Sequence, residues 1–268
     1  MDSIKRGIQF RSEFRDKTKL GEAAKIETEL QDLADPAIAG HSSRFFKTAP
    51  GEYGAGNVFL GIRVPVLRKV AAKNRFIDLH TAVELLHSDY HEIRLTALLI
   101  MVEQFKHGDA RLQTAVYCAY LANTAQINNW DLVDSSAHLI VGPYLEMKDR
   151  RVLYRLAASE NLWERRIAIM ATFHYIRRDS FDETLKLAEI LLNDPHDLIH
   201  KAVGWMLREV GKRDMARETN FLDLNYQKMP RTMLRYAIER FLEPQRQAYL
   251  RGTTYFPESK KARDPDPS

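Results

Sequence analysis

The sequence of 268 residues contains a single cysteine, Cys118, so it can form neither an intrachain disulfide nor a zinc site made of several thiolates. It also lacks any apolar run that approaches the roughly 18 residues needed to span a membrane. The N-terminal stretch alternates charged with apolar residues and has no apolar core typical of a secretory signal. From these absences we expect a protein of a reducing compartment, without a membrane span, in the cytoplasm.

Glycine is scarce, and no convincing stretch alternates apolar and polar residues as a half-buried strand does. This pattern argues against a doubly wound sheet and against a β-sandwich. Charge of neither sign dominates, because 40 Lys and Arg residues stand against 36 Asp and Glu residues, for a net charge of +4. The small excess permits an acidic partner without requiring one.

Helical periods dominate the chain, and the expected helices come in pairs that repeat about every 35–40 residues. Four helices open alike, with polar or acidic residues followed by an apolar face, near His91, Asn128, Leu162 and His196. Such weak self-similarity is typical of stacked helix pairs. The sequence therefore predicts an all-α fold, a HEAT-like helical-repeat α-solenoid, curved, with one helix of each pair lining its concave face.

The repeats are expected to fill residues 21–251, between a basic N-terminal arm (1–20) and a disordered C-terminal tail (252–268) rich in proline and charge. Residues 49–56 hold three glycines and a proline, which predicts a loop. The expected helices span residues 21–34, 64–74, 79–87, 91–106, 109–123, 127–146, 150–158, 162–177, 181–192, 196–211, 214–224 and 231–242.

Two inner helices carry a charged residue within an apolar face. In helix 127–146, Asp134 interrupts this face and Trp130 lies one turn before it. A buried carboxylate without a partner is costly, so either neighbouring serines or an arginine stabilise Asp134, or it serves chemistry. In helix 162–177, Arg166 interrupts the face in the same way. It can pair with Asp134 between repeats, or offer its planar guanidinium to a phosphate.

The next inner helix places Trp205 off its core face, on the side of Lys201 and Arg208. An indole between two cations can be a cation–π shelf or a contact face for a nucleotide. Further along, Arg231 and Arg235 follow Pro230 on one helix face, within a region that holds eleven basic and six acidic residues over 200–251. This surface is either a phosphate-binding site or a solvated face.

No metal or cofactor is expected. His196 and His200 have the spacing of a zinc-binding helix, but Asp197 replaces the general-base glutamate and no third ligand is evident. The sequence contains no phosphate-binding loop, no dinucleotide fingerprint and no serine nucleophile elbow. A metal-dependent hydrolase is therefore the weakest of the alternatives.

Several motifs, in this order, resemble the AlkD-type DNA alkylation repair glycosylases. The resemblance extends over roughly residues 40–245 and is carried by Phe59–Pro65 (FLGIRVP), Asn128–Asp134 (NNWDLVD), Ser159–Thr172 (SENLWERRIAIMAT), Asp197–Asp214 (DLIHKAVGWMLREVGKRD) and Met229–Phe241 (MPRTMLRYAIERF). It implies that Asp134 is the catalytic carboxylate, that Trp130 and Trp205 flank the lesion, and that Arg166 binds the DNA backbone. Tyr53 is the nearest candidate for the family's lesion-proximal tyrosine.

The resemblance implies hydrolysis of the N-glycosidic bond of N3- or N7-alkylated purines in duplex DNA bound on the concave face. Basic residues are expected to grip phosphates, namely Arg166, Lys201, Arg208, Arg231 and Arg235. We expect a monomer with no cofactor and no obligate protein partner. The main alternative is a non-catalytic HEAT-like module that binds a DNA structure or a protein.

Overall fold

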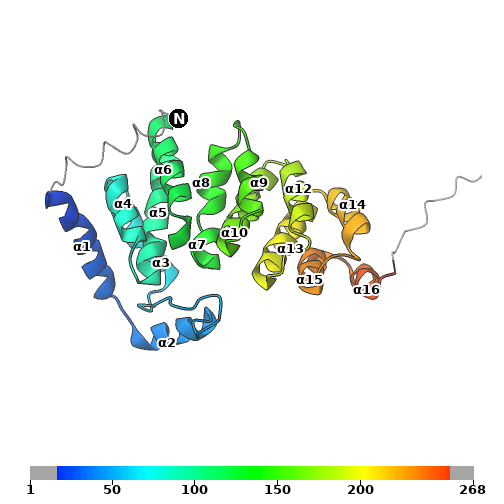
Figure 1. Ribbon diagram of the computed structural model, residues 1–268, viewed down its shortest axis with the longest axis horizontal. Helices are drawn as coiled ribbons and strands as arrows, with labels where there is room; N and C mark the ends of the chain where they lie inside the picture. The colour runs from blue at the N-terminus through cyan, green and yellow to red at the C-terminus, as the bar shows by residue number, and fades with distance from the viewer. Residues whose placement is uncertain (1–16, 254–268) are drawn as a thin grey trace, which may run out of the picture. The chain divides into compact units, whose positions relative to one another are not determined.

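The structure, a computed structural model, describes residues 17–253, and every regular element in this range is a helix (Figure 1). The expectation of an all-α fold built from helical repeats is therefore confirmed, while the curvature expected of a solenoid stays a prediction. The chain divides into two compact units, residues 1–148 and 149–268. No helix within residues 17–253 is both long and apolar enough to cross a bilayer.

The first unit packs around one long central helix. Its helices are α1 (Lys17–Gln31), α2 (Pro36–Phe45), α3 (Val64–Lys73), α4 (Leu79–Leu86), α5 (His91–His107), α6 (Ala110–Ala122), the 3₁₀ turn η2 (Thr124–Gln126), α7 (Trp130–Asp134) and α8 (Ala137–Tyr144). Helix α5 packs against α3, α4, α6, α7 and α8, and fourteen of its seventeen residues are buried. A helix that is buried on all sides is the core of its unit, and its polar residues therefore need partners inside the protein.

The second unit packs around α13 in the same manner. Its helices are α9 (Arg151–Ala157), α10 (Leu162–Ala171), α11 (Phe173–Ile176), α12 (Asp182–Ile190), α13 (Asp197–Gly211), α14 (Met215–Asn225), α15 (Arg231–Ala237), the 3₁₀ turn η3 (Ile238–Arg240) and α16 (Glu243–Arg251). Helix α13 packs against α10, α12, α14 and α15. A side chain at Gly204 would collide with the Met233 carbonyl oxygen of α15, so glycine allows these two helices to pack closely.

A buried arginine fastens the start of α5 to its surroundings. Arg94 is 4% exposed, and its Nη1 donates to the carbonyl oxygens of Ser88 (2.9 Å) and Asp89 (3.0 Å), in the turn before its own helix. Its Nη2 donates to Oδ1 of Asn128, 3.2 Å away in the turn that precedes α7. The guanidinium therefore links the first turn of one repeat to the turn that begins the next.

The second unit repeats this arrangement at the start of α10. Nη1 of Arg165 donates to the carbonyl oxygens of Ser159 (3.0 Å) and Glu160 (2.9 Å), and its Nε donates to Oδ2 of Asp194, 2.5 Å away before α13. Arg94 and Arg165 are both the fourth residue of their helices. This shared contact pattern supports the internal repeat inferred from the sequence.

The structure divides two of the expected helices. Instead of one helix over 127–146 it has α7 and α8, and instead of one over 162–177 it has α10 and α11. At both breaks a hydroxyl bonds to a backbone carbonyl, from Ser136 to Leu132 (2.6 Å) and from Thr172 to Ile169 (2.7 Å). Such local bonds compete with helix continuation.

The structure also adds α2 and α16, which the sequence analysis did not predict. Helix α2 has the local signals of a helix start, since Asp35 accepts hydrogen bonds from the N–H groups of Ala37 and Ile38 and Pro36 occupies its first position. None of its residues is buried, so it lacks the apolar face on which the prediction relied. The predicted loop over 49–56 is confirmed, whereas the outer parts of the predicted arm and tail, 1–16 and 254–268, lie outside the described residues.

One buried carboxyl group in the second unit, that of Glu218, has a raised pKa. Glu218 of α14 is 1% exposed, and its Oε1 has no hydrogen-bond partner in the structure. Burial raises the pKa of Glu218 from the ordinary 4.5 to about 8, and the nearby positive charge of Arg208 offsets only part of this effect. The folded protein therefore holds a proton on Glu218 at pH values where the unfolded chain has lost it.

We predict that Glu218→Gln weakens the pH dependence of stability between about pH 4.5 and 8. In the wild type the folded state binds the extra proton in this window, so the free energy of unfolding falls as pH rises, by up to about 1.4 kcal/mol per pH unit. The glutamine carries no proton to lose, so its curve should be flatter. Urea unfolding of both proteins at several pH values measures this, and parallel curves would contradict it.

Candidate functional site

In the first unit, α7 brings together two of the predicted site residues. Trp130 and Asp134 are the first and last residues of this five-residue helix, and a separation of four residues places them on one face. The helix begins where it does because Oδ1 of Asn129 accepts a hydrogen bond from the backbone N–H of Trp130 at 2.8 Å. Both side chains are half-buried, so each is partly accessible from solvent.

The Trp130 indole belongs to an aromatic cluster. It stacks on Phe46, with ring centroids 5.1 Å apart and an interplanar angle of 24°, and meets Phe45 edge-on at 5.9 Å. Phe46 in turn stacks on Phe59 at 5.0 Å. Phe45 is 58% exposed, so an aromatic face is open to solvent beside Trp130. The sequence analysis missed both phenylalanines because they lie at the end of the unpredicted helix α2.

The segment that supports this cluster is fixed by a buried carboxylate of α5. Glu92 is 4% exposed and accepts hydrogen bonds from three consecutive backbone N–H groups, those of residues 60–62, at 2.8–3.3 Å. Gly61 has a φ of +84°, and a side chain there would collide with the carbonyl oxygen of Asp35. Glycine is therefore required at this position, and the fixed backbone holds Phe59 beneath Phe46.

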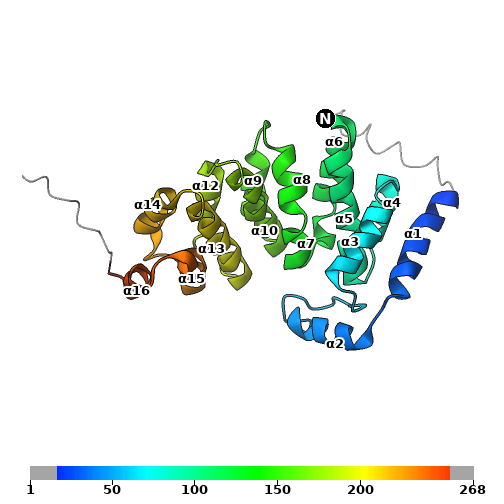
Figure 2. The same ribbon diagram turned by 180° about the vertical axis from the view of Figure 1, so that it is seen from behind.

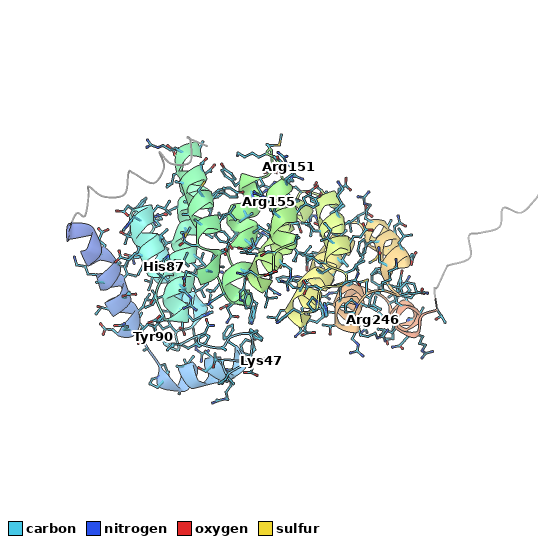
Figure 3. The ribbon with its side chains drawn as sticks, viewed as in Figure 1. Lys47, His87, Tyr90, Arg151, Arg155 and Arg246 are labelled. Carbon is cyan, nitrogen blue, oxygen red and sulfur yellow. The ribbon has the colours of Figure 1, made fainter. Side chains whose placement is uncertain are left out.

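Tyr53 lies close to the cluster. Its hydroxyl donates to the carbonyl oxygen of Phe45, 3.5 Å away, and the Phe45 ring touches Trp130. Lys47 follows the two phenylalanines in sequence and is exposed near the end of α2 (Figure 3). This edge of the unit therefore combines aromatic side chains with a positive charge.

The two carboxylates of α7 have different surroundings. Asp131 is bonded through both oxygens, Oδ2 to Nε2 of His91 at 2.8 Å and Oδ1 to the N–H of Leu132 at 2.9 Å. Asp134 lies near the buried Tyr120. Burial raises the pKa of the Tyr120 hydroxyl, and the negative charge of Asp134 raises it further. Asp131 thus holds α7 against α5, whereas Asp134 ends the helix at the half-buried edge.

In the second unit, Arg166 lies inside the protein. It is 4% exposed, and its Nη1 donates to the carbonyl oxygen of Leu198, which fixes α10 against the start of α13. Its role as a phosphate contact stays a prediction.

A glutamate on the same helix orients Trp205. The indole Nε1 donates to Oε1 of Glu209 at 3.0 Å, and the ring contacts Phe173 with centroids 6.1 Å apart. Glu209 is held by Lys212, whose Nζ lies 2.6 Å from the same oxygen. Trp205 is half-buried, so part of the indole remains accessible. The spacing of four residues between Trp205 and Glu209 was visible in the sequence, but the sequence analysis did not use it.

The predicted phosphate contacts of this unit fall into two groups. Lys201 pairs with Asp197 at 2.7 Å, and Arg208 forms an ion pair with Glu239. Arg231 and Arg235 are both exposed, and neither side chain makes a hydrogen bond or ion pair with another residue of the described range, 17–253. Among the predicted phosphate contacts, these two arginines on α15 are therefore the most available to an anionic partner.

The two histidines with zinc-like spacing have local backbone partners. Nδ1 of His196 accepts from the N–H of Leu198 at 3.1 Å, and Nε2 of His200 lies 2.5 Å from the carbonyl oxygen of Asp194. Among the described residues, no group of three or more His, Cys, Asp or Glu side chains is arranged to hold a metal ion. The histidine pair thus shapes the start of α13.

Comparisons with known proteins agree with the resemblance drawn from the motifs. The family described as DNA alkylation repair enzyme matches residues 26–241. The structure is similar to that of a predicted DNA alkylation repair enzyme from Enterococcus faecalis, with a TM-score of 0.62 and 17% identity, over 78% of this chain and 97% of that chain. No curated protein matches the sequence. The family match covers most of the chain, and the protein therefore belongs to the DNA alkylation repair enzyme family.

Proposed function

We propose that this protein is a DNA glycosylase that hydrolyses the N-glycosidic bond of N3- or N7-alkylated purines in duplex DNA. The observation that carries the proposal is the face of α7, on which Trp130 and Asp134 stand together beside the exposed ring of Phe45. The aromatic rings suit the apolar face of a substrate, and the carboxylate suits a part of it that carries positive charge. Family membership supports DNA as the substrate.

The chemistry requires little acid catalysis. An alkylated purine already carries a positive charge, so it departs as a neutral base without protonation. Positive charge instead develops on the deoxyribose as the bond breaks, and a nearby carboxylate stabilises it and positions the attacking water. Asp134 is the candidate among the two α7 carboxylates because it shares a helix face with Trp130, four residues away, whereas Asp131 holds α7 against α5 through His91.

The two indoles add a second source of stabilisation. A π face attracts positive charge, and it does so more strongly where water is excluded. Trp130 is supported from one side by Phe46, and Trp205 is held by Glu209. Indoles fixed in this way lose little further entropy when the sugar binds. We propose that each indole contacts the damaged DNA, with Tyr53 and Phe45 next to Trp130.

We propose that positively charged side chains of the second unit bind the DNA backbone. Arg231 and Arg235 are exposed, and Lys201 and Arg208 can exchange their present carboxylate partners for phosphates. Arg166 remains a proposed phosphate contact that also fixes α10 to α13. We propose that the protein acts as a monomer without a cofactor, in the compartment that holds the DNA.

We predict that Asp134→Asn slows release of 7-methylguanine from methylated duplex DNA by at least about 10²-fold, the usual cost of removing a charge that stabilises a transition state. The thermal midpoint should change little, because the amide keeps the size of the carboxylate. Base release by chromatography and thermal unfolding measure the two effects.

Asp131→Asn is the matched control on the same helix. It weakens the bond to His91, so it should lower the unfolding midpoint more than Asp134→Asn does. Equal rates for wild type and Asp134→Asn would remove Asp134 from the mechanism. A wild type that binds DNA but releases no alkylated base would instead favour the non-catalytic module.

Glu209→Ala is expected to free the Trp205 indole from its acceptor and to slow base release by about tenfold, because a hydrogen bond to a charged group contributes roughly 1.5 kcal/mol. Glu209→Gln keeps an acceptor oxygen and should retain most of the activity. Fluorescence of variants in which Trp205 is the only tryptophan reports the orientation directly. Unchanged emission and activity in Glu209→Ala would show that this bond does not matter.

The double variant Arg231→Gln, Arg235→Gln should reduce the salt dependence of binding to undamaged duplex DNA. Each lost phosphate contact lowers the slope of log K against log salt by about 0.9, so we expect a decrease of about 1.8 for the pair. Arg151→Gln with Arg155→Gln is the matched control, because these exposed arginines lie at the other edge of the same unit (Figure 3). Equal slopes for both double variants would exclude α15 from the interface.

A further inference from the structure

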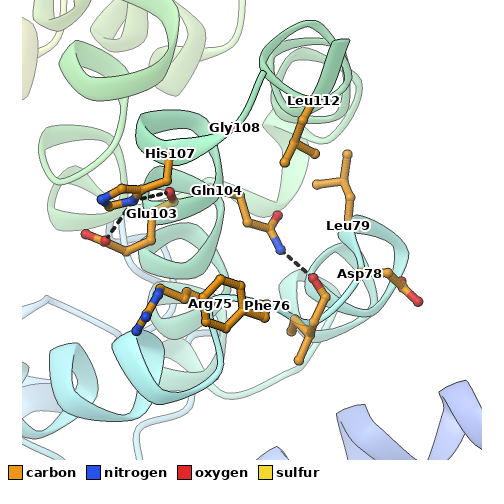
Figure 4. A pocket seen from close by; sticks show the side chains of 10 residues that line it. Arg75, Phe76, Asp78, Leu79, Glu103, Gln104, His107, Gly108 and Leu112 are labelled. Atoms are coloured by element: carbon orange, nitrogen blue, oxygen red, sulfur yellow. Dashed lines mark hydrogen bonds and ion pairs between the residues drawn. The ribbon is translucent and has the colours of Figure 1, made fainter. Parts of the chain in front are cut away.

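The first unit contains a cavity of about 350 Å³ at the end of α5. Figure 4 shows the residues that line it. It lies where the turn between α3 and α4 meets the end of α5 and the start of α6. The lining residues are Arg75, Phe76, Ile77, Asp78, Leu79, Glu103, Gln104, His107, Gly108 and Leu112. Helix α5 has seventeen residues and is therefore about 25 Å long, so this cavity is separate from the cluster around His91 and Trp130.

A buried amide in the cavity lacks one hydrogen bond. Gln104 is 6% exposed, and its Nε2 donates to the carbonyl oxygen of Ile77 at 2.7 Å (Figure 4). This bond fixes the orientation of the amide, because only the nitrogen can donate to a carbonyl. Its Oε1 is buried and has no partner, which costs about 1–3 kcal/mol unless a donor arrives. The amide therefore holds the α3–α4 turn against the end of α5 and forms part of the cavity wall.

The rest of the cavity favours an apolar occupant. Phe76 is 82% exposed, and the guanidinium of Arg75 covers its ring at 4.3 Å. Leu79 and Leu112 line the cavity and are only half-buried. Glu103 is 32% exposed at the edge, with its Oε2 3.5 Å from Nδ1 of His107. The fitting partner is a peptide segment that carries a large apolar side chain next to a positive charge.

Residues 1–16, MDSIKRGIQFRSEFRD, have this composition and are attached nearby. They carry Phe10 and Phe14 as large apolar side chains, with Arg11 and Arg15 immediately after them. The segment joins α1 at Lys17, and α1 packs against α4, whose first residue, Leu79, lines the cavity. In Figures 1 and 2 both helices begin at the same, upper edge of the unit.

The tether is long enough for this segment to reach the cavity. Packed helix axes lie about 8–10 Å apart, so the cavity lies within about two helix spacings of the start of α1. An extended chain covers about 3.3–3.6 Å per residue, so Phe10 reaches about 24 Å from Lys17 and spans this distance, whereas Phe14 reaches only about 10 Å.

We propose that the cavity between the α3–α4 turn and the α5–α6 junction binds residues 1–16 of the same chain, with Phe10 against Phe76. The bound segment then covers an exposed phenylalanine. Arg11 follows Phe10 in sequence and supplies a positive charge that complements Glu103 at the edge of the cavity. The N-terminal segment is then a part of the first unit.

Hydrogen exchange followed by mass spectrometry tests this binding. We expect deletion of residues 1–16 to raise exchange by about tenfold in residues 74–79 and 103–112, which corresponds to about 1.4 kcal/mol of lost protection. The double variant Phe10→Ser, Phe14→Ser in the full chain should have the same effect. Deletion of residues 254–268, a segment of similar length at the other end, is the matched control and should leave both regions unchanged.

A synthetic peptide of residues 1–16, added to the truncated protein, should restore protection in both regions. Equal exchange in the full and truncated chains would overturn the proposal. Protection that depends on protein concentration would also overturn it, because the occupant would then be the segment of a second copy. None of these measurements uses base release, so the result is independent of the proposed activity.

Discussion

The arginine contacts at the starts of α5 and α10 are the interaction on which both units depend. A guanidinium taken out of water is stable only when its N–H groups meet acceptors in good geometry. Arg94 meets most of this requirement with two carbonyls of its own turn, with Asn57 and with Asn128 of the next repeat, and its Nε lacks a partner among the described residues. Because Asn128 precedes the cap residue Asn129, the same contact determines where α7 starts, and hence where Trp130 lies.

The equivalent arginine in the second unit has the same consequence for α13. Arg165 holds Asp194, which also accepts the N–H of His196 at 2.8 Å and binds His200 through its carbonyl. These bonds fix the first turn of α13, and eight residues after its first residue the helix presents Trp205. In each unit the helix that carries the indole is thus positioned by an arginine that connects the turn of its own repeat to the next.

The sequence could predict what depends on local spacing. Trp130 and Asp134 share a face because they are four residues apart, and this holds although the expected long helix is broken. The phenylalanines at the end of α2 could not be found, because that helix has no buried face and its contact with Trp130 spans more than eighty residues. The sequence analysis selected Arg166 because it interrupts an apolar face. The sequence does not reveal the role of its neighbour Arg165, because this role depends on a bond to Asp194, twenty-nine residues away.

The two ends of α5 differ in how their buried polar groups are hydrogen-bonded. A helix buried along most of its length must satisfy the polar groups of its buried residues within the protein. At its start the two oxygens of Glu92 accept three N–H groups, and Nε2 of His91 is bonded to Asp131. These bonds make the aromatic cluster rigid before any substrate arrives. At its other end Gln104 has one of its two polar atoms bonded, beside a cavity with apolar walls. The start of α5 thus fixes its own neighbouring residues, whereas its end leaves a cavity that can accommodate a further peptide segment.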